Sequence, residues 1–434
     1  MTQQVIAAPG FPSWRTAHRA LLVLGLLAFV TSMDITMTSL LVEPMKRELV
    51  LSDIQIGFLQ GTVYGIGYGL SAMPLGRLID SRTRTRLLLA GMLVWAVAMA
   101  ATALAHGVGL LLVCRVLLGV VTALVLPASI SLIADLFAPT QRTVATSLFA
   151  TGQACGQAFG ILAGGLVFDR LTWLVAWAPA AFHGLSPWRV EYIGAGILCL
   201  VLAPLLLMMD EPARHERDAT RISGREALLE LWSYRRFVAP LIAAMLFSVI
   251  ALQATMVWAA PLLIRRFGQT PGQFAGWLSG ITLVGGILGA LAGGRLAELG
   301  RRRLGAGGVL LPALIAALAS VPLALFGLAP TVPVFALLLG LSLFCGGLIQ
   351  TIGVVAFTLN IPNEIRGLGI GVYVLIVALF GTATAPTAVA VVSRLLGGED
   401  RLGLAIAAVS APAMLVSALF FGLAMRNAAR RTAG

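Results

Sequence analysis

The chain has 434 residues, of which 59% are hydrophobic and 11% charged, and its formal net charge is +12. A soluble domain carries about 25% charged residues, so a water-facing surface over most of this chain is excluded. The basic residues stand in short clusters between apolar runs, which is typical of membrane-protein loops and argues against a nucleic-acid partner. The four cysteines show no paired spacing and no neighbouring histidine, so we expect no disulfide framework, metal site or cofactor.

The apolar runs have the length of membrane-spanning helices. Crossing a hydrocarbon core of about 30 Å takes about 20 helical residues, and the first run is too long for a signal-peptide core of about 7–15 residues. In chain order the predicted spans are residues 20–44, 54–79, 86–106, 108–135, 142–168 and 190–209, then 237–263, 273–297, 306–328, 331–359, 367–393 and 402–425.

A charged interval separates the two sets of six spans. We predict an N-terminal six-helix bundle at residues 1–209, a cytoplasmic linker at 210–236 and a C-terminal six-helix bundle at 237–434. Within the linker, residues 223–232 are expected to form a short surface helix. The fold class is therefore an all-α membrane protein, with twelve transmembrane helices in two pseudo-symmetric six-helix bundles.

Most of the 30 Lys and Arg residues fall at the two chain ends and in the loops after the even-numbered spans. Loops rich in Lys and Arg stay on the cytoplasmic side of a membrane. We therefore expect a multi-pass protein of the cell inner membrane with both termini in the cytoplasm.

The loop after the second span carries a compact charged motif. Gly76 allows close helix contact, Asp80 stands at the membrane surface, and Arg84 and Arg86 follow. A carboxylate at that place can accept hydrogen bonds from the free N–H groups at a neighbouring helix N-terminus. Such a contact can form in one arrangement of the halves and break in another, which would make a gate. The alternative is that these charges only orient the protein in the membrane.

The second half repeats this motif after its own second span, at Gly294, Glu298 and Arg302. Parallel repeats related by an axis along the membrane normal build many transporters from two six-helix halves. The repeat therefore favours a protein that moves one bundle against the other, with a gate in each half.

Asp34 and Arg115 are the only ionisable residues predicted deep inside apolar spans. A charge at that depth costs about 2.5–3.5 kcal/mol on insertion scales and is a functional candidate. At a rise of about 1.5 Å per residue, the two residues lie at similar heights, so we expect them to form or alternate an ion pair. The pair could be purely structural, or Arg115 could instead bind a substrate carboxylate or phosphate.

Other polar side chains in the predicted cavity spans are uncharged. Thr122, Gln253 and Gln350 are candidates for substrate contact, although each could equally hydrogen-bond a neighbouring helix. A mostly apolar cavity with one cation suits an amphipathic substrate with a single anionic group. In the fifth span, the glycines at four-residue spacing from Gly152 to Gly164 predict a flat face for close helix packing.

These motifs resemble those of a known family. The run GRLIDSRTRTR resembles the loop signature of the major facilitator superfamily, and Leu111, Arg115, Gly119 and Ala123 resemble its fourth-span signature. The runs SMDITMTSLLVEPMKRELVLSDIQIGFLQG and LPASISLIADLF, with the WR and DEPAR elements, are similar to the bacterial spinster-like branch. The resemblance implies a major facilitator fold with a central cavity lined by spans 1, 4, 7 and 10.

Spinster-like proteins are associated with sphingolipid-like and lysophospholipid substrates, often with proton coupling. Here Ile35 stands where that branch usually has Arg, and Thr122 where it usually has Glu, so coupled transport and an uncoupled facilitator both stay open.

The expected function is secondary active transport of a small amphipathic or lipid-like solute by alternating access, with proton symport as an option. An organic-anion or drug transporter of the same superfamily is the alternative. We expect no enzyme, because His215-Glu216 has no second histidine at metalloprotease spacing and no nucleophile elbow occurs. The expected partners are a small-molecule or lipid substrate and membrane lipid, and we expect a monomer.

Overall fold

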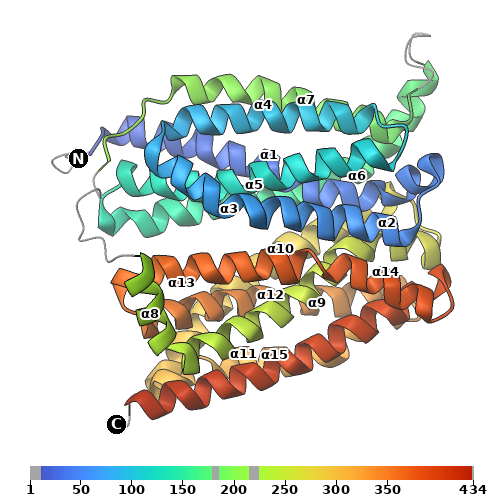
Figure 1. The fold of residues 1–434 in the computed structure, drawn as a ribbon. Helices are drawn as coiled ribbons and strands as arrows, with labels where there is room; N and C mark the ends of the chain where they lie inside the picture. Colours follow the sequence, from blue (N-terminus) through green and yellow to red (C-terminus); the bar gives the residue numbers. More distant parts are fainter. Residues whose placement is uncertain (1–10, 178–184, 215–223, 433–434) are drawn as a thin grey trace, which may run out of the picture. The chain divides into compact units, whose positions relative to one another are not determined.

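A computed structural model describes residues 11–177, 185–214 and 224–432, which are almost entirely helical (Figure 1). Up to the linker the helices are α1 (Trp14–Leu49), α2 (Asp53–Gly57), a π-helical segment (Phe58–Val63), α3 (Tyr64–Ser81), α4 (Arg84–Ala103), α5 (Val108–Leu136), α6 (Pro139–Trp177), α7 (Pro187–Leu202) and a 3-10 segment (Ala203–Met208).

The linker helix α8 (Gly224–Ser233) lies where the surface helix was predicted. It is followed by α9 (Arg235–Phe267), α10 (Pro271–Gly308), α11 (Leu311–Leu323), a 3-10 segment (Ala324–Leu328), α12 (Val332–Asn360), α13 (Asn363–Ile376), a π-helical segment (Val377–Thr382), α14 (Ala385–Leu395), a 3-10 turn (Glu399–Arg401) and α15 (Leu402–Thr432).

Every predicted span overlaps helix in the described residues, although some boundaries differ: α10 runs to Gly308, whereas the predicted eighth span ends at 297. Ten described helical segments are long and apolar enough to cross a membrane. The two other predicted spans are also helical. Span 54–79 corresponds to the continuous run from α2 through α3, and span 142–168 corresponds to α6. Both helical runs are longer than the roughly 20 residues that a membrane crossing needs.

Local sequence explains where several helices start and stop. Ser52 and Gln55 form a capping box at the start of α2: the Ser52 side chain accepts from the Gln55 N–H, and the Gln55 side chain accepts from the Ser52 N–H. Thr270 and Gln273 form the same arrangement at the start of α10. Gly268 ends α9 at φ +63°, a left-handed conformation in which a side chain would be strained.

The chain forms two compact units. Unit 1 consists of Met1–Leu49 and Ile66–Thr220, and unit 2 consists of Val50–Gly65 and Arg221–Gly434. The second predicted span is thus divided at the bond between Gly65 and Ile66, with its first part packed among the helices that follow the linker.

Unit 1 is held together by a glycine-lined contact between α1 and α6, which lie side by side in Figure 1. A Cβ atom added at Gly156 would lie 2.1 Å from the Phe29 carbonyl oxygen, and one added at Gly160 would lie 2.3 Å from the Met33 carbonyl oxygen. The Thr36 hydroxyl also donates to the Gln157 carbonyl at 2.7 Å. The predicted glycine face of the fifth span is therefore the surface on which α1 packs.

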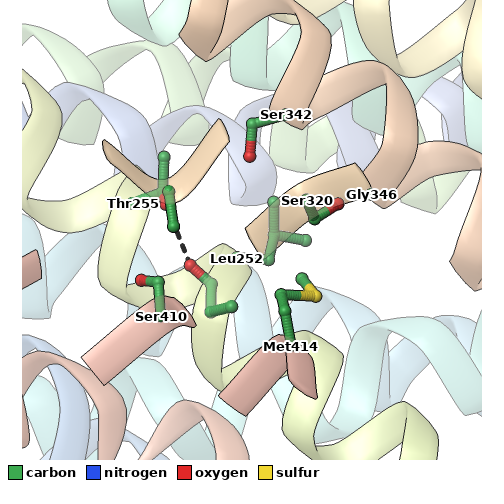
Figure 2. Close-up of a pocket in the computed structure, with 9 residues that line it drawn as sticks. Leu252, Thr255, Ser320, Ser342, Gly346, Ser410 and Met414 are labelled. Atoms are coloured by element: carbon green, nitrogen blue, oxygen red, sulfur yellow. Dashed lines mark hydrogen bonds between the residues drawn. The ribbon is translucent and has the colours of Figure 1, made fainter. Parts of the chain in front are cut away.

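Unit 2 has a core of fully buried apolar side chains from α9, α12 and α15, among them Phe237, Leu241, Ile349 and Phe421. Close to this core lies a small cavity of about 10 Å³ (Figure 2). Its polar lining is the hydroxyls of Thr255, Ser320, Ser342 and Ser410.

Thr255 and Ser320 donate to carbonyls of their own helices at 2.9 and 2.8 Å, and the buried Ser410 hydroxyl has no partner among the described residues. A cavity of this size with hydroxyl lining can hold one water molecule.

Candidate functional site

A buried polar network in unit 1 joins Asp34 of α1 to Arg115 of α5. The Arg115 Nη1 atom lies 3.3 Å from the Asp34 Oδ2 atom, and the two residues are 5% and 2% exposed. The second Arg115 nitrogen, Nη2, donates to the Thr38 hydroxyl at 3.0 Å and to the Tyr192 hydroxyl at 2.8 Å. The structure thus brings together the two ionisable residues that the sequence singled out.

Two hydroxyls close the network into a ring. The Thr38 hydroxyl lies 3.1 Å from Asp34 Oδ1 and 2.7 Å from the Tyr192 hydroxyl, which comes from α7. The Arg115 guanidinium also lies 6.0 Å from the centre of the Tyr192 ring, within cation–π range. Burying two charges is tolerable only where opposite charge and hydrogen bonds compensate for lost water, and this ring supplies both.

Sequence reasoning missed Thr38 and Tyr192. Thr38 stands four residues after Asp34, so one helical turn places both side chains on the same face of α1. Tyr192 follows the WR element at Trp188-Arg189, whose position is fixed by a second ion pair. The Arg189 guanidinium lies 2.8 Å from Glu48 of α1, and Arg189 also donates to the Ala103 carbonyl at 2.5 Å.

The three uncharged candidates lie in different helices: Thr122 in α5, Gln253 in α9 and Gln350 in α12. The Thr122 hydroxyl donates to the Leu118 carbonyl of its own helix at 2.9 Å. Gln350 of α12 donates to the Ser248 hydroxyl of α9 at 3.1 Å and accepts from the Tyr373 hydroxyl of α13 at 3.1 Å. Gln253 lies half-buried in α9. Gln350 therefore ties helices together within unit 2, while Thr122 satisfies its own backbone.

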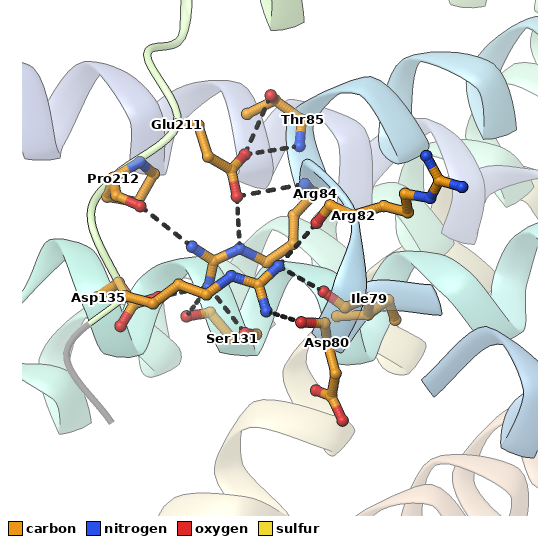
Figure 3. A network of polar contacts seen from close by, with 10 residues as sticks. Ile79, Asp80, Arg82, Arg84, Thr85, Ser131, Asp135, Glu211 and Pro212 are labelled. Carbon is orange, nitrogen blue, oxygen red and sulfur yellow. Dashed lines mark hydrogen bonds and ion pairs between the residues drawn. The ribbon is translucent and has the colours of Figure 1, made fainter. Parts of the chain in front are cut away.

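The motif after the second span builds a network in unit 1 around Arg84 (Figure 3). Arg84 is 1% exposed and lies at the start of α4. Its side chain pairs with Asp135 at the end of α5 and with Glu211, whose Oε1 atom is 2.8 Å from the Arg84 Nε atom. It also donates to the Ser131 hydroxyl at 2.9 Å.

The carboxylate at the N-terminus of α4 belongs to Glu211 rather than to Asp80. Glu211 accepts from the backbone N–H groups of Arg84 and Thr85 at 3.2 and 3.0 Å. Partial burial alone would raise the pKa of Glu211, but the hydrogen bonds from the Arg84 side chain and these N–H groups hold that pKa below its usual range. Glu211, a residue of the DEPAR element, thus makes at the start of α4 the kind of contact that was expected of Asp80 at a neighbouring helix, and the gating role of Asp80 stays a prediction.

The Asp80 carboxylate, Arg86 and Gly76 lie outside this network. Figure 3 shows the Asp80 carboxylate pointing away from Arg84, and only its backbone carbonyl takes part, accepting from Arg214. Arg86 is exposed. A Cβ atom at Gly76 would meet no described atom within 4 Å, so Gly76 is not in a close helix contact in this structure.

The repeat in unit 2 is built differently. Glu298 pairs with Arg301 and Arg302 of the same helix, at 2.8 and 2.7 Å, and all three side chains are exposed. A Cβ atom at Gly294 would also meet no described atom within 4 Å. The two halves thus share the motif in sequence, but only the first half buries its arginine.

The part of the divided span that precedes Ile66 is anchored inside unit 2. Arg265 of α9 makes a bidentate ion pair with Asp53, with nitrogen–oxygen distances of 2.6 and 2.8 Å. Cβ atoms added at Gly57 and Gly61 would lie 2.7 Å from the Pro386 carbonyl oxygen and 2.8 Å from the Ala383 carbonyl oxygen. The segment from 53 to 65 therefore packs with almost no gap against the helix α14 and the turn before it.

Asp34 and Arg115 are not the only buried ionisable groups in the apolar helices. Glu43 of α1 and Glu191 of α7 are 7% and 6% exposed. They were overlooked because they lie near the ends of their predicted spans. No group of three or more His, Cys, Asp or Glu side chains that could hold a metal occurs among the described residues.

The sequence is related to known transporters. It is 26% identical over 287 residues to an MFS-type efflux pump of Mycolicibacterium smegmatis, covering 65% of this chain and 63% of that protein. It is 24% identical over 282 residues to the uncharacterized MFS-type transporter EfpA of Mycobacterium tuberculosis, covering 64% and 44%. The chain thus spans less than two thirds of the length of these relatives.

The fold is shared with solved transporter structures. A bacterial homolog of the human lysosomal transporter Spinster superposes with a TM-score of 0.76 at 21% identity, covering 97% of this chain and 98% of that chain. The nucleoside transporter NupG superposes with a TM-score of 0.71 at 14% identity, covering 93% and 98%. The family description "Major Facilitator Superfamily" matches residues 24–382. Because this family description covers most of the chain, the chain belongs to the major facilitator superfamily, and the relatives matched here are named as transporters or efflux pumps.

Proposed function

We propose that this transporter carries a small amphipathic or lipid-like solute by alternating access, coupled to protons. The observation that carries the proposal is the closed Asp34–Arg115 network in unit 1. The two opposite charges compensate each other, and the neighbouring Thr38 and Tyr192 of the same unit add only hydroxyl groups. A solute that meets these side chains needs an apolar body and few charges, because a multiply charged solute would find no matching partner among them.

Alternating access is supported by the division of the second span. Residues on either side of the Gly65–Ile66 bond pack closely on different units. A Cβ atom at Gly65 would lie 2.5 Å from the Ala383 Cβ atom in unit 2, and one at Gly67 would lie 2.5 Å from the Val116 carbonyl oxygen in unit 1. A rearrangement of the units must therefore bend the chain at this joint or release residues 50–65, including the Asp53–Arg265 pair.

The efflux of drugs or organic anions is a second candidate, favoured by the names of the relatives. Besides the Mycolicibacterium smegmatis efflux pump, they include the multidrug resistance protein MdtG of Escherichia fergusonii, which is 28% identical over 262 residues. Such a substrate would use the same network, with Arg115 turning from Asp34 to an anionic group of the solute. An uncoupled facilitator would need no proton-binding group.

The solute class is tested by the thermal stability of the purified protein with lysophospholipids, organic acids and cationic drugs. A bound solute stabilises the folded protein by RT ln(1 + [L]/Kd), about 2.7 kcal/mol at a hundredfold excess over Kd. We expect lysophospholipids to raise the melting temperature and Arg115→Gln to reduce that effect. Stabilisation by cationic drugs alone would overturn the lipid-like assignment.

Coupling is tested by flux in proteoliposomes. We expect wild-type protein to accumulate the stabilising solute when a proton gradient is imposed and Asp34→Asn to lose the pH dependence of uptake. Equilibration without accumulation would identify a facilitator. An Asp34→Asn protein with an unchanged pH profile would remove Asp34 as the coupling acid.

A further inference from the structure

Glu191 is a buried carboxyl group without a hydrogen-bond partner. It lies in the second turn of α7 and is 6% exposed, and neither of its carboxyl oxygens has a partner in the part of the chain that the structure describes. Its sequence neighbour Tyr192 belongs to the Asp34–Arg115 network, so Glu191 stands beside that network without joining it.

The charged side chains around α7 are engaged elsewhere. Helix α7 packs on α1, α4 and α6. The charged residues from 34 to 48 on α1, in the first half of α5, at the described end of α6 and on α7 besides Glu191 are Asp34, Glu43, Lys46, Arg47, Glu48, Arg115, Asp169, Arg170 and Arg189, and Arg47 is exposed. Arg189 pairs with Glu48, and Arg115 pairs with Asp34 and Tyr192.

Glu43, Lys46 and Asp169 have interactions of their own, and Arg170 is exposed. The α4 side chains from residue 87 onward carry no charge.

An ionised carboxylate without a partner in an apolar bundle would lose its hydration and gain nothing in return. The neutral acid avoids most of this cost. Asp34 differs from Glu191, because an adjacent guanidinium and a hydroxyl stabilise its charged form. Asp34 and Glu191 are therefore set up for opposite charge states.

We propose that Glu191 is a proton-binding site of this transporter, holding a proton in the described conformation and releasing it when water reaches α7. On release the carboxyl O–H bond breaks, the proton passes to water, and a carboxylate remains. Glu191 lies one helical turn from Pro187, where α7 begins, so the path to the predicted outer surface is short. The role in coupling rests on the proposed function, whereas the protonation of Glu191 does not.

The charge state is tested by infrared difference spectroscopy on purified full-length protein at neutral pH. We expect wild-type protein to show the C=O stretch of a protonated carboxylic acid that Glu191→Gln lacks. The matched control Glu230→Gln, on the linker helix α8, should leave that band in place. An identical band in wild-type protein and Glu191→Gln, or no band in either, would overturn the proposal.

The melting temperature provides a second test of the charge state of Glu191. Gln has the shape of a neutral Glu, and Leu is apolar, so both Glu191→Gln and Glu191→Leu should keep the wild-type melting temperature at neutral pH. A large loss of thermal stability in both variants would mean that Glu191 is ionised and paired, against the proposal.

The transport role is tested with pH profiles of solute flux in proteoliposomes. We expect Glu191→Gln to flatten the profile while solute still binds in the thermal-shift assay. An unchanged profile would overturn the coupling role of Glu191. If wild-type protein moved none of the tested solutes, the proposed function would fail, yet the infrared band would still decide whether Glu191 binds a proton.

Discussion

The buried charges of unit 1 are compensated residue by residue. Arg115 has its charge balanced by Asp34, and its Nη2 atom donates to the hydroxyls of Thr38 and Tyr192. Arg84 likewise forms ion pairs with Asp135 and Glu211 and donates a hydrogen bond to the Ser131 hydroxyl. In each case segments distant in sequence supply the partners, so the network also fixes which parts of unit 1 pack together.

Removing one charge of the Asp34–Arg115 pair should cost more than removing both. Asp34→Asn leaves a buried guanidinium without a counter-charge, which typically costs about 3–5 kcal/mol. In the double variant Asp34→Asn/Arg115→Gln no charge is buried, so much of that loss should be recovered. Melting temperatures of the two single variants and the double variant form the thermodynamic cycle. Additive losses would show that the two residues do not interact.

Glu211 should give the protein an acid-sensitive contact. Its pKa is lowered in the folded protein, so its stabilising contribution is present above the unfolded value of about 4.3 and is lost as the pH falls through the lower folded value.

Glu211→Gln should lower the melting temperature at pH 7 by roughly 2–4 °C, the scale of about 1 kcal/mol. It should also weaken the acid dependence below pH 5. Glu230→Gln is the control, and equal acid sensitivity of Glu211→Gln and wild type would contradict the assignment.

At the scale of elements, glycine decides how closely the helices approach. The spacing of Gly152, Gly156 and Gly160 puts their Cα atoms on one face of α6, and the α1 backbone occupies the space that side chains would fill. The same device anchors residues 53–65 through Gly57 and Gly61. In both places hydrogen bonds from threonine to the opposite carbonyl, such as Thr62 to Ala383 at 2.9 Å, add to the packing.

Gly156→Ala should separate α1 from α6. The added carbon would lie 2.1 Å from the Phe29 carbonyl oxygen, so the helices must shift, at a cost of about 1–3 kcal/mol. The matched control is Gly194→Ala in α7, where no described atom lies within 4 Å and alanine favours helix. Thermal unfolding in one detergent measures both variants. A Gly156→Ala protein as stable as Gly194→Ala would contradict the close contact.

At the scale of the whole molecule, the distribution of arginine predicts the orientation of the helices in the membrane. A chain with the twelve predicted spans is expected to place the loops after the second and eighth spans on one face and the loop after the eleventh on the other. Arg86, Arg302 and Arg394 are exposed in these three places.

Topology is measured with single-cysteine variants on a background without the four native cysteines. We expect Arg86→Cys and Arg302→Cys to react with an impermeant maleimide from the cytoplasmic side only, and Arg394→Cys from the outer side only. The result follows from the preference of Lys and Arg for the cytoplasmic face. Labelling of Arg86→Cys and Arg302→Cys from opposite faces would contradict the parallel repeat.

The sequence by itself determined the architecture of this protein. Apolar runs of membrane-spanning length, the charged break near residue 210 and the repeated motif at Gly76 and Gly294 were enough to predict the helices, the surface helix α8 and the superfamily. These features are local or periodic, so they can be read without knowing any contact. Matching depths in two spans also indicated that Asp34 and Arg115 would meet, because a charge in an apolar span needs a partner.

Only the tertiary structure decided which partner each polar group takes. The carboxylate at the start of α4 is Glu211, more than a hundred residues away in sequence, and Asp80 points elsewhere. The repeated motif is similar in sequence in the two halves but differs in structure. Glu298 forms exposed ion pairs with Arg301 and Arg302, whereas Arg84 of the first half is buried against Asp135. Glu191 is neutral in the proposal because no described residue hydrogen-bonds to its carboxyl oxygens. Partners and burial depend on the packing of distant helices, which no spacing along the chain specifies.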